Sequence, residues 1–163
     1  GMEVRDCKPA IIASSKFEAQ LLGDLLRNAG TSDVCIFTDM ASALDGLFAG
    51  RANIVFITED GGGAALDLVR QLRRSTPHPL RKAPVFIVSA ALTLALAERC
   101  RIAGANAIIG KPISSAVLSN TIKKVLGKPR PFIEGDNYVG PCRRAGIVTA
   151  GTGKHRRQTD PAV

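Results

Sequence analysis

A short apolar run in the middle of the chain ends in residues that could do chemistry. Residues 53–57 are Asn-Ile-Val-Phe-Ile, and Thr58, Glu59 and Asp60 follow before three consecutive glycines. The run is too short for a helix and rich in β-branched residues, which is typical of a strand buried on both faces of a parallel sheet. In open α/β sheets, ligand-binding and catalytic residues lie at the carboxyl ends of such strands. A carboxylate there can act as a nucleophile, whereas a threonine hydroxyl needs a general base.

The segments that must position these residues alternate between strands and helices. Apolar runs predict five strands, at about residues 8–13, 34–38, 53–58, 85–89 and 107–110. Amphipathic segments predict five helices, at about residues 16–29, 39–49, 63–74, 92–103 and 114–126. The first of these helices carries an apolar stripe that includes Phe17 and Leu21, and a basic, proline-broken connection covers residues 73–82. The alternation predicts an α/β fold with a parallel sheet covered by helices on both faces.

Composition narrows the class of protein. With 163 residues, 45% of them hydrophobic and 22% charged, the chain is typical of a globular domain with an appendage. No apolar run approaches the roughly 20 residues of a membrane span, so we expect a cytoplasmic protein without membrane contact. The cysteines at 7, 35, 100 and 142 form no CxxC motif. We expect them to be small buried hydrophobes, and we expect no metal site.

The basic charge is concentrated at the C-terminal end. The net charge is +8, and residues 127–163 hold 7 Lys/Arg against 3 Asp/Glu. We therefore predict a domain over residues 1–127 and an irregular basic extension, rich in Gly, Pro and Arg, over residues 128–163. Tyr138, Arg143 and Arg144 are its candidate interaction residues. The pattern leaves open whether the extension docks on its own domain, binds a partner or contacts neither.

Motifs at the strand ends resemble a known family. Residues 108–112 are Ile-Ile-Gly-Lys-Pro, residues 88–90 are Val-Ser-Ala, and residues 103–105 are Ala-Gly-Ala. Over about residues 8–127 the chain resembles the CheY-like receiver domains of bacterial response regulators. The resemblance implies a flavodoxin-like, doubly wound sheet of five parallel strands in the order 2-1-3-4-5.

The resemblance also implies a phosphorylation site, and here it is degenerate. In a working receiver an acidic pair holds Mg²⁺, and an aspartate at the end of the third strand accepts the phosphoryl group. A hydroxyl and a lysine bind the phosphoryl oxygens. An aromatic side chain on the fifth strand changes its orientation when the domain switches state. The corresponding residues of this chain, in the same order, are Ser14 and Ser15, Thr58, Ser89 and Lys111, and Ile108. Only the hydroxyl and the lysine are kept.

These replacements argue against phosphotransfer. Mg²⁺ prefers carboxylate oxygens, and two serine hydroxyls do not neutralise it. The covalent phosphoryl intermediate forms on a carboxylate, which Thr58 lacks. We therefore predict a pseudo-receiver with no cofactor and no enzymatic activity. We expect Lys111 to be fixed to Thr58, Ser14 or a loop carboxylate, which would hold the domain in a single state.

The favoured function is a phosphorylation-independent protein–protein interaction module in bacterial signal transduction. One alternative is an atypical phospho-accepting receiver that uses Glu59 or Asp60 after a shift of the strand. A second is a nucleic-acid-associated regulator that acts through the basic extension. Leu94 points away from the apolar side of its predicted helix and is expected to be exposed. In receivers that helix, the fifth strand and the last helix form the partner surface, so a homodimer through this face is one candidate assembly.

Overall fold

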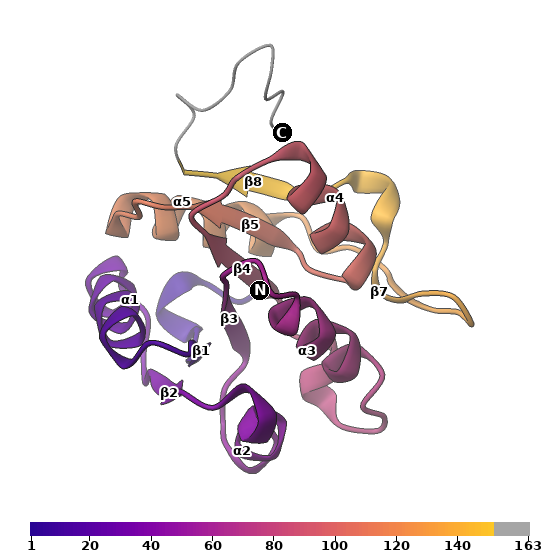
Figure 1. Cartoon of the computed structure of the whole chain (residues 1–163), viewed down its shortest axis with the longest axis horizontal. Coiled ribbons are helices and arrows are strands. Elements are labelled where there is room, and N and C mark those ends of the chain that lie inside the picture. Colours follow the sequence, from indigo (N-terminus) through magenta and orange to yellow (C-terminus); the bar gives the residue numbers. More distant parts are fainter. Residues whose placement is uncertain (152–163) are drawn as a thin grey trace.

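A six-stranded parallel sheet forms the centre of the molecule (Figure 1). The computed structural model describes residues 1–151. The strands of this sheet are β1 (Pro9–Ile12), β2 (Cys35–Phe37), β3 (Ile54–Glu59), β4 (Val85–Ser89), β5 (Ala107–Gly110) and β8 (Val148–Ala150). They lie in the order β2-β1-β3-β4-β5-β8, and each neighbouring pair is parallel. The predicted fold class and the predicted order of the first five strands are confirmed.

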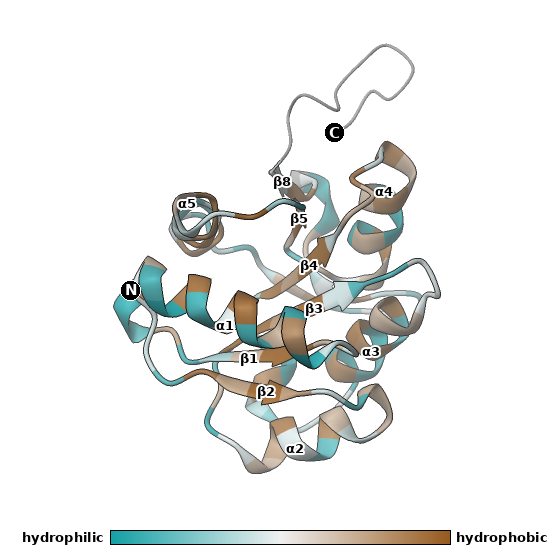
Figure 2. Ribbon diagram, turned by 60° about the vertical axis from the view of Figure 1, so that its left-hand side comes forward, coloured by the Kyte–Doolittle hydropathy of each residue, from teal (hydrophilic) through white to brown (hydrophobic). Residues whose placement is uncertain are grey.

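Helices cover both faces of this sheet. They are α1 (Lys16–Ala29), α2 (Ala43–Ala49), α3 (Ala64–Arg73), α4 (Leu94–Ala103) and α5 (Ser115–Gly127). Helices α1 and α5 pack on one face, and α2, α3 and α4 pack on the other (Figures 1 and 2). The hydroxyls of Ser15, Thr93 and Ser114 accept a backbone N–H at the starts of α1, α4 and α5. Because Thr93 is the N-cap, α4 begins two residues later than predicted.

Alternation along the strands divides the core into two layers. Successive side chains of a strand point to opposite faces, so Ile57, Ile87 and Ile108 lie on the side of α3 and α4. Phe56 and Phe86 lie on the side of α1 and α5, where their rings stack with centroids 4.6 Å apart. The polar residues that follow each strand are therefore held on rigid, fully buried supports.

The apolar stripe of α1 is narrower than predicted. Leu22 and Leu26 are buried against the sheet, whereas Phe17 and Leu21 are 78% and 50% exposed. Residues 22 and 26 are one helical turn apart and share a face, and residues 17 and 21 lie on a face rotated away from the sheet. The predicted apolar stripe therefore packs on the sheet only in part, since these two side chains are exposed.

The extension is more ordered than its composition predicts. It contains a hairpin of β6 (Phe132–Glu134) and β7 (Val139–Pro141), and β8 then pairs with β5. The prediction of a five-stranded sheet and an irregular extension is corrected at this point. A strand edge offers unpaired N–H and C=O groups to any extended backbone, so β8 needs no apolar pattern to join it. Residues 152–163 of the predicted extension lie outside the described residues, and the domain boundary at residue 127 stays a prediction.

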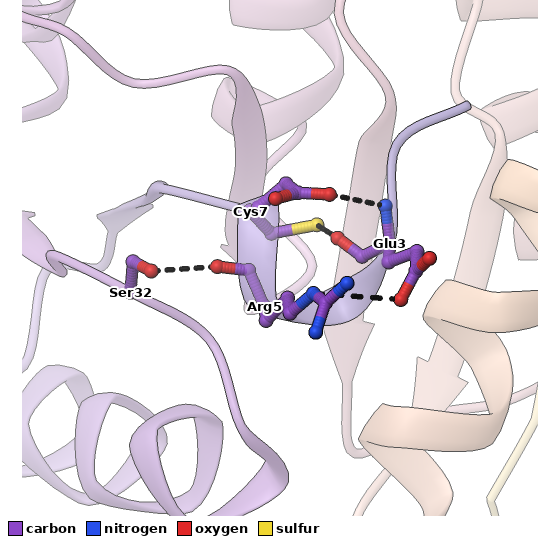
Figure 3. A network of polar contacts seen from close by, with 5 residues as sticks. Glu3, Arg5, Cys7 and Ser32 are labelled. Carbon is purple, nitrogen blue, oxygen red and sulfur yellow. Dashed lines mark hydrogen bonds and ion pairs between the residues drawn. The ribbon is translucent and has the colours of Figure 1, made fainter.

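A short N-terminal turn, η1 (Val4–Asp6), is tied to the domain before β1 begins (Figure 3). The Glu3 amide donates to Oδ2 of Asp6 at 2.9 Å, and the Cys7 thiol donates to the Glu3 carbonyl at 3.4 Å. The Ser32 hydroxyl donates to the Arg5 carbonyl at 2.6 Å. These contacts fix the entry of the chain into β1.

Two other sequence predictions concern the cysteines and the membrane. Cys7 and Cys100 are buried, whereas Cys35 and Cys142 are only half-buried. Within residues 1–151, every helix is too short or too polar to cross a bilayer.

Candidate functional site

The ends of β3, β4 and β5 bring three polar residues to one edge of the sheet. Glu59 is level with Ser89, and Ser89 is level with Gly110, which precedes Lys111. Strand β3 thus ends at Glu59, one residue beyond Thr58. Thr58 and Glu59 are both buried, at 7% and 4% exposure. Because both positions are buried, the sequence pattern could not distinguish them.

The Glu59 carboxylate is held by its own loop. Its Oε2 accepts the amide N–H groups of Gly61 at 2.6 Å and Gly63 at 3.1 Å. Both glycines have positive φ angles, +105° and +83°, so the loop can fold its amides back on Glu59 only because these residues lack a Cβ. Its Oε1 is buried and has no hydrogen-bond partner among the described residues. Asp60 is exposed and accepts the Gly62 amide at 3.2 Å.

The serine hydroxyls at this edge are also occupied. Ser89 is 3% exposed, and its hydroxyl accepts the Ala91 amide at 3.1 Å. The Ser15 hydroxyl accepts the Glu18 amide at 3.2 Å as the N-cap of α1. Ser14 is exposed in the bend between β1 and α1. Glu59, Ser89 and Lys111 therefore come together at this edge, whereas Ser15 caps the helix beside them.

Lys111 forms an ion pair with Glu18 of α1. The prediction that Lys111 contacts Thr58, Ser14 or a loop carboxylate is wrong about the partner. Glu18 lies in the first turn of α1, where a negative charge is favoured by the helix dipole. Helix α1 begins just after the carboxyl end of β1, so its first turn lies at the carboxyl edge of the sheet. Glu18 and Lys111 therefore meet although they are 93 residues apart in the sequence. Partial burial lowers the pKa of the Lys111 ammonium.

Glu59 also influences a thiol below the edge. Burial raises the pKa of the Cys100 thiol to about 12, and the negative charge of Glu59 adds to the increase. Cys100 belongs to α4 and lies in the core layer shared by α3 and α4. The Glu59 side chain therefore lies on the side of the sheet that α4 covers, and Thr58, one residue earlier, lies on the opposite side.

Comparison with known proteins agrees with this architecture. Solved structures superpose on about three quarters of the chain: chemotaxis response regulator CheY4 of Vibrio cholerae matches with a TM-score of 0.62 and 17% identity over 73% of this chain and 98% of that one. A response regulator from Thermotoga maritima matches with a TM-score of 0.61 and 22% identity over 76% and 99%. The signal receiver domain of a DNA-binding response regulator from Colwellia psychrerythraea matches with a TM-score of 0.60 and 24% identity over 76% and 100%. The chain has the CheY-like receiver fold.

A sequence comparison points in the same direction. The chain is 28% identical over 120 residues to the sensory/regulatory protein RpfC of two Xanthomonas campestris strains. The match covers 73% of this chain and only 16% of RpfC, so the chain corresponds to a small part of that protein. No family model matches the chain.

Two predictions about this receiver fold concern the switch position and the metal. Ile108 is fully buried on β5, level with Ile87 of β4 and Thr149 of β8. Within residues 1–151 the structure has no group of three or more His, Cys, Asp or Glu side chains that could hold a metal ion. The expectation that this chain binds no metal stays a prediction.

The candidate interaction residues lie in different places on the receiver fold. Leu94 is 51% exposed at the start of α4, so its predicted exposure is confirmed. Tyr138 is buried, and its hydroxyl donates to the Pro141 carbonyl at 2.6 Å. The Arg143 guanidinium lies 4.1 Å from the centre of the Tyr138 ring, and Arg144 is exposed. Within the extension, Tyr138 thus serves as an internal anchor.

The partner face that the resemblance implies is altered in this protein. Strand β8 runs along the outer edge of β5, between α4 and α5 (Figure 1). A second copy of the chain at this face would meet β8 and not the bare edge of β5.

Arg73 is a residue that sequence reasoning missed. It ends α3, is fully buried, and donates four hydrogen bonds to neutral acceptors, the carbonyls of Gly104, Arg81 and Ala83 and Oδ1 of Asn106. The sequence pattern placed it where the predicted helix of residues 63–74 overlaps the basic connection of residues 73–82 and assigned it no role. A signal existed, since Arg73 follows the inward-facing Val69 by four residues and so shares its helix face.

Proposed function

We propose that this chain is a receiver-like module of bacterial signal transduction that works through protein–protein contacts without phosphorylation. In this proposal it has no enzymatic activity, binds no metal and acts in the cytoplasm. The receiver fold and the similarity to part of a sensory/regulatory protein support a role in signalling. The state of the carboxyl edge supports independence from phosphorylation.

One observation carries the proposal: Oε2 of Glu59, the Ser89 hydroxyl and the Lys111 ammonium are already bonded within the chain, and at Glu59 only Oε1 has no partner among the described residues. The Glu59 carboxylate holds two loop amides, the Ser89 hydroxyl holds the Ala91 amide, and Lys111 is paired with Glu18. A phosphoryl group would have to displace these contacts. In addition, Ser14 and Ser15 lack the charge needed to neutralise Mg²⁺, which normally bridges protein carboxylates and phosphate.

The strand register supports a different residue at the acceptor position from Thr58. We assign that position to Glu59, because it ends β3 and is level with Ser89. Its carboxylate already accepts the amides of Gly61 and Gly63 and so orders the loop that follows the strand. Because these bonds need no phosphoryl group, the domain is expected to rest in one conformation.

Intact-mass spectrometry after incubation with acetyl phosphate and Mg²⁺ tests the proposal. We expect no added phosphoryl mass on the wild-type chain, and no Mg²⁺-dependent change of the melting temperature. Covalent phosphorylation of the wild type would overturn the proposal. The variants Glu59→Gln and Asp60→Asn would then show which carboxylate accepts the group, since only loss of the true acceptor abolishes the added mass.

The partner surface is tested separately. We propose that the exposed side of α4 around Leu94 contacts the signalling partner, with β8 forming part of the same face. Sedimentation of the wild type and of Leu94→Asp would show whether a homodimer uses this face. A dimer that Leu94→Asp dissociates supports that assembly, and a dimer that Leu94→Asp leaves intact excludes Leu94 from its interface.

A further inference from the structure

A large cavity lies at the opposite edge of the sheet from Glu59. It has a volume of about 860 Å³, and Pro84 and Asn106, which precede β4 and β5, line it. The end of α5 and the extension supply other walls. Pockets that hold small organic ligands commonly measure about 300–1,000 Å³. The cavity is therefore large enough for a ligand well beyond a single inorganic ion.

The charges around this cavity have one sign. Its lining contains no Asp or Glu, and it contains five cationic side chains: Lys82, Lys124, Lys128, Arg130 and Arg144. None of the five forms an ion pair among the described residues. The C-terminal end of α5 contributes only about half of one negative charge. The pKa of Glu134 is lowered by its hydrogen bond to Arg81 and also by the charge of Lys82, so this carboxylate lies in the neighbourhood of Lys82. Cations without an ion-pair partner still dominate this concave surface and concentrate anions.

A buried cation reinforces this potential from behind the cavity wall. Arg73 is fully buried, and all its hydrogen-bond partners are neutral. Buried charges are normally paired with an opposite charge, and within residues 1–151 Arg73 has no carboxylate partner. Burial lowers the pKa of Arg73 to about 10, so the side chain stays charged at neutral pH.

Asn106 connects Arg73 to the cavity. Its Oδ1 accepts from Arg73 at 2.8 Å and from the Val85 amide at 2.9 Å. Its side-chain nitrogen has no hydrogen-bond partner among the described residues and is a free donor in a residue that lines the cavity. The wall thus offers a neutral donor in addition to the flexible cations.

The cavity also has an apolar part. Phe132 and Ile147 line it, and the Phe132 ring lies 4.9 Å from the Arg81 guanidinium and 5.5 Å from the Lys82 ammonium. Arg81 is itself paired with Glu134 at 2.7 Å, which holds the hairpin in place. A rigid aromatic surface beside several cations suits a ligand with an anionic part and an organic body.

We propose that this cavity binds a small organic ligand that carries at least two phosphate groups. A terminal phosphate carries about 1.5 to 2 negative charges at neutral pH and each inner phosphate of a chain about one, so a di- or triphosphate brings roughly three to four charges to the five cations. Arginine and lysine at the end of α5 and in the extension hold the phosphates. The organic body lies against Phe132 and Ile147. The inference goes beyond the proposed function and does not depend on it.

Isothermal titration of the full chain with ATP, inorganic triphosphate and adenosine tests the inference. We expect ATP to bind most tightly, triphosphate to bind more weakly and adenosine not to bind, with both phosphate ligands weakened at high ionic strength. The absence of heat with ATP and triphosphate would overturn the inference. Equal affinities for these two would overturn the role assigned to the organic body.

A charge-neutralising variant locates the binding. The double variant Lys124→Gln, Arg144→Gln should weaken ATP about fivefold for each charge removed, because one charge at close range in water contributes about 1 kcal/mol. The matched control Lys16→Gln, Arg51→Gln removes two exposed charges that do not line the cavity and should leave the affinity unchanged. An equal loss in both variants would show non-specific attraction. Binding of a single-stranded oligonucleotide without binding of either phosphate ligand would assign the surface to nucleic acid instead.

Discussion

The two edges of the same sheet differ in how their polar groups are used. At the carboxyl edge, Glu59, Ser89 and Lys111 are each bonded to a group of the same chain. At the amino edge, five cations surround a cavity without a carboxylate, and Arg73 lies buried among neutral acceptors. The contrast teaches that the landmarks by which the chain resembles a receiver need not mark the place where it is prepared for a ligand.

Energetics explain why the difference matters. A buried polar group that already has its partner gains little from a ligand, whereas an uncompensated charge gains from any anion that reaches it. Apart from Oε1 of Glu59, which has no partner among the described residues, the carboxyl edge is thus expected to be static, and the amino edge to respond to anions and to salt. Four changes test this comparison, beginning with the one of largest expected effect.

The strongest test replaces Arg73 with methionine. Arg73→Met removes the donors for three buried carbonyls and for Asn106, and each unsatisfied buried acceptor costs about 1–3 kcal/mol. We expect the free energy of unfolding in urea to fall by at least about 3 kcal/mol. The control Arg74→Met changes the exposed neighbour and should stay within about 0.5 kcal/mol of the wild type. Equal midpoints for the two variants would mean that Arg73 does not hold the amino edge together.

The second test concerns the anchor of the extension. A Cβ on Gly140 would lie 2.6 Å from the Tyr138 hydroxyl oxygen and 3.1 Å from Cα of Gly104, and its φ of +157° also favours glycine. We expect Gly140→Ala to cost about 1–3 kcal/mol and to speed hydrogen exchange of the Val148 amide, which donates to the Asn106 carbonyl. Gly135→Ala is the matched control, because its Cβ would meet nothing closer than 3.6 Å. An unchanged hydrogen-exchange rate of the Val148 amide in Gly140→Ala would show that packing of the hairpin does not stabilise β8.

The third test measures how stability depends on pH through Cys100, which lies in the core beneath the carboxyl edge. The folded pKa of Cys100 is about 12, against an ordinary value of 9.0, so above pH 9 the unfolded chain loses this proton first. The contribution of the Cys100 thiol to the free energy of unfolding is therefore fully present well below pH 9 and is lost as pH rises toward 12, by about 1 kcal/mol between pH 8 and 10. Urea unfolding of Cys100→Ala should show a decline that is smaller by this amount. Leu96→Ala, which also opens a cavity under α4, should keep the wild-type decline, and a change of slope there would argue against Cys100 as the cause.

The smallest expected effect is at the ion pair of the carboxyl edge. The Lys111 and Glu18 side chains are 32% and 29% exposed, so solvent screens their attraction in part. A double-mutant cycle with Lys111→Met and Glu18→Gln should give a coupling below about 1 kcal/mol. The more exposed pair Arg27 and Asp24 should give less. A larger coupling at the surface pair would mean that the contact at Lys111 is not stabilising.

Local signals in the sequence predicted most of the fold. Apolar runs placed the first five strands, and hydroxyl residues and glycines marked several helix ends, because strand burial and helix capping depend on a few neighbouring residues. The resemblance at residues 108–112 and 88–90 then supplied the strand order, which the structure confirms. The exposure of Leu94 followed from the helical period alone.

Tertiary structure decided what depends on distant segments. The end of β3 at Glu59 depends on its pairing with β4, since a one-residue shift on a strand buried on both faces leaves no trace in its apolar pattern. The pairing of Lys111 with Glu18 and of β8 with β5 joins parts of the chain that share no local signal. Arg73 was the hardest case, because a charged side chain predicts exposure until the carbonyls of three other segments surround it. The sequence therefore determined the scaffold and the loss of the acidic pair, and the packing of distant segments decided which charges were compensated and which remain available.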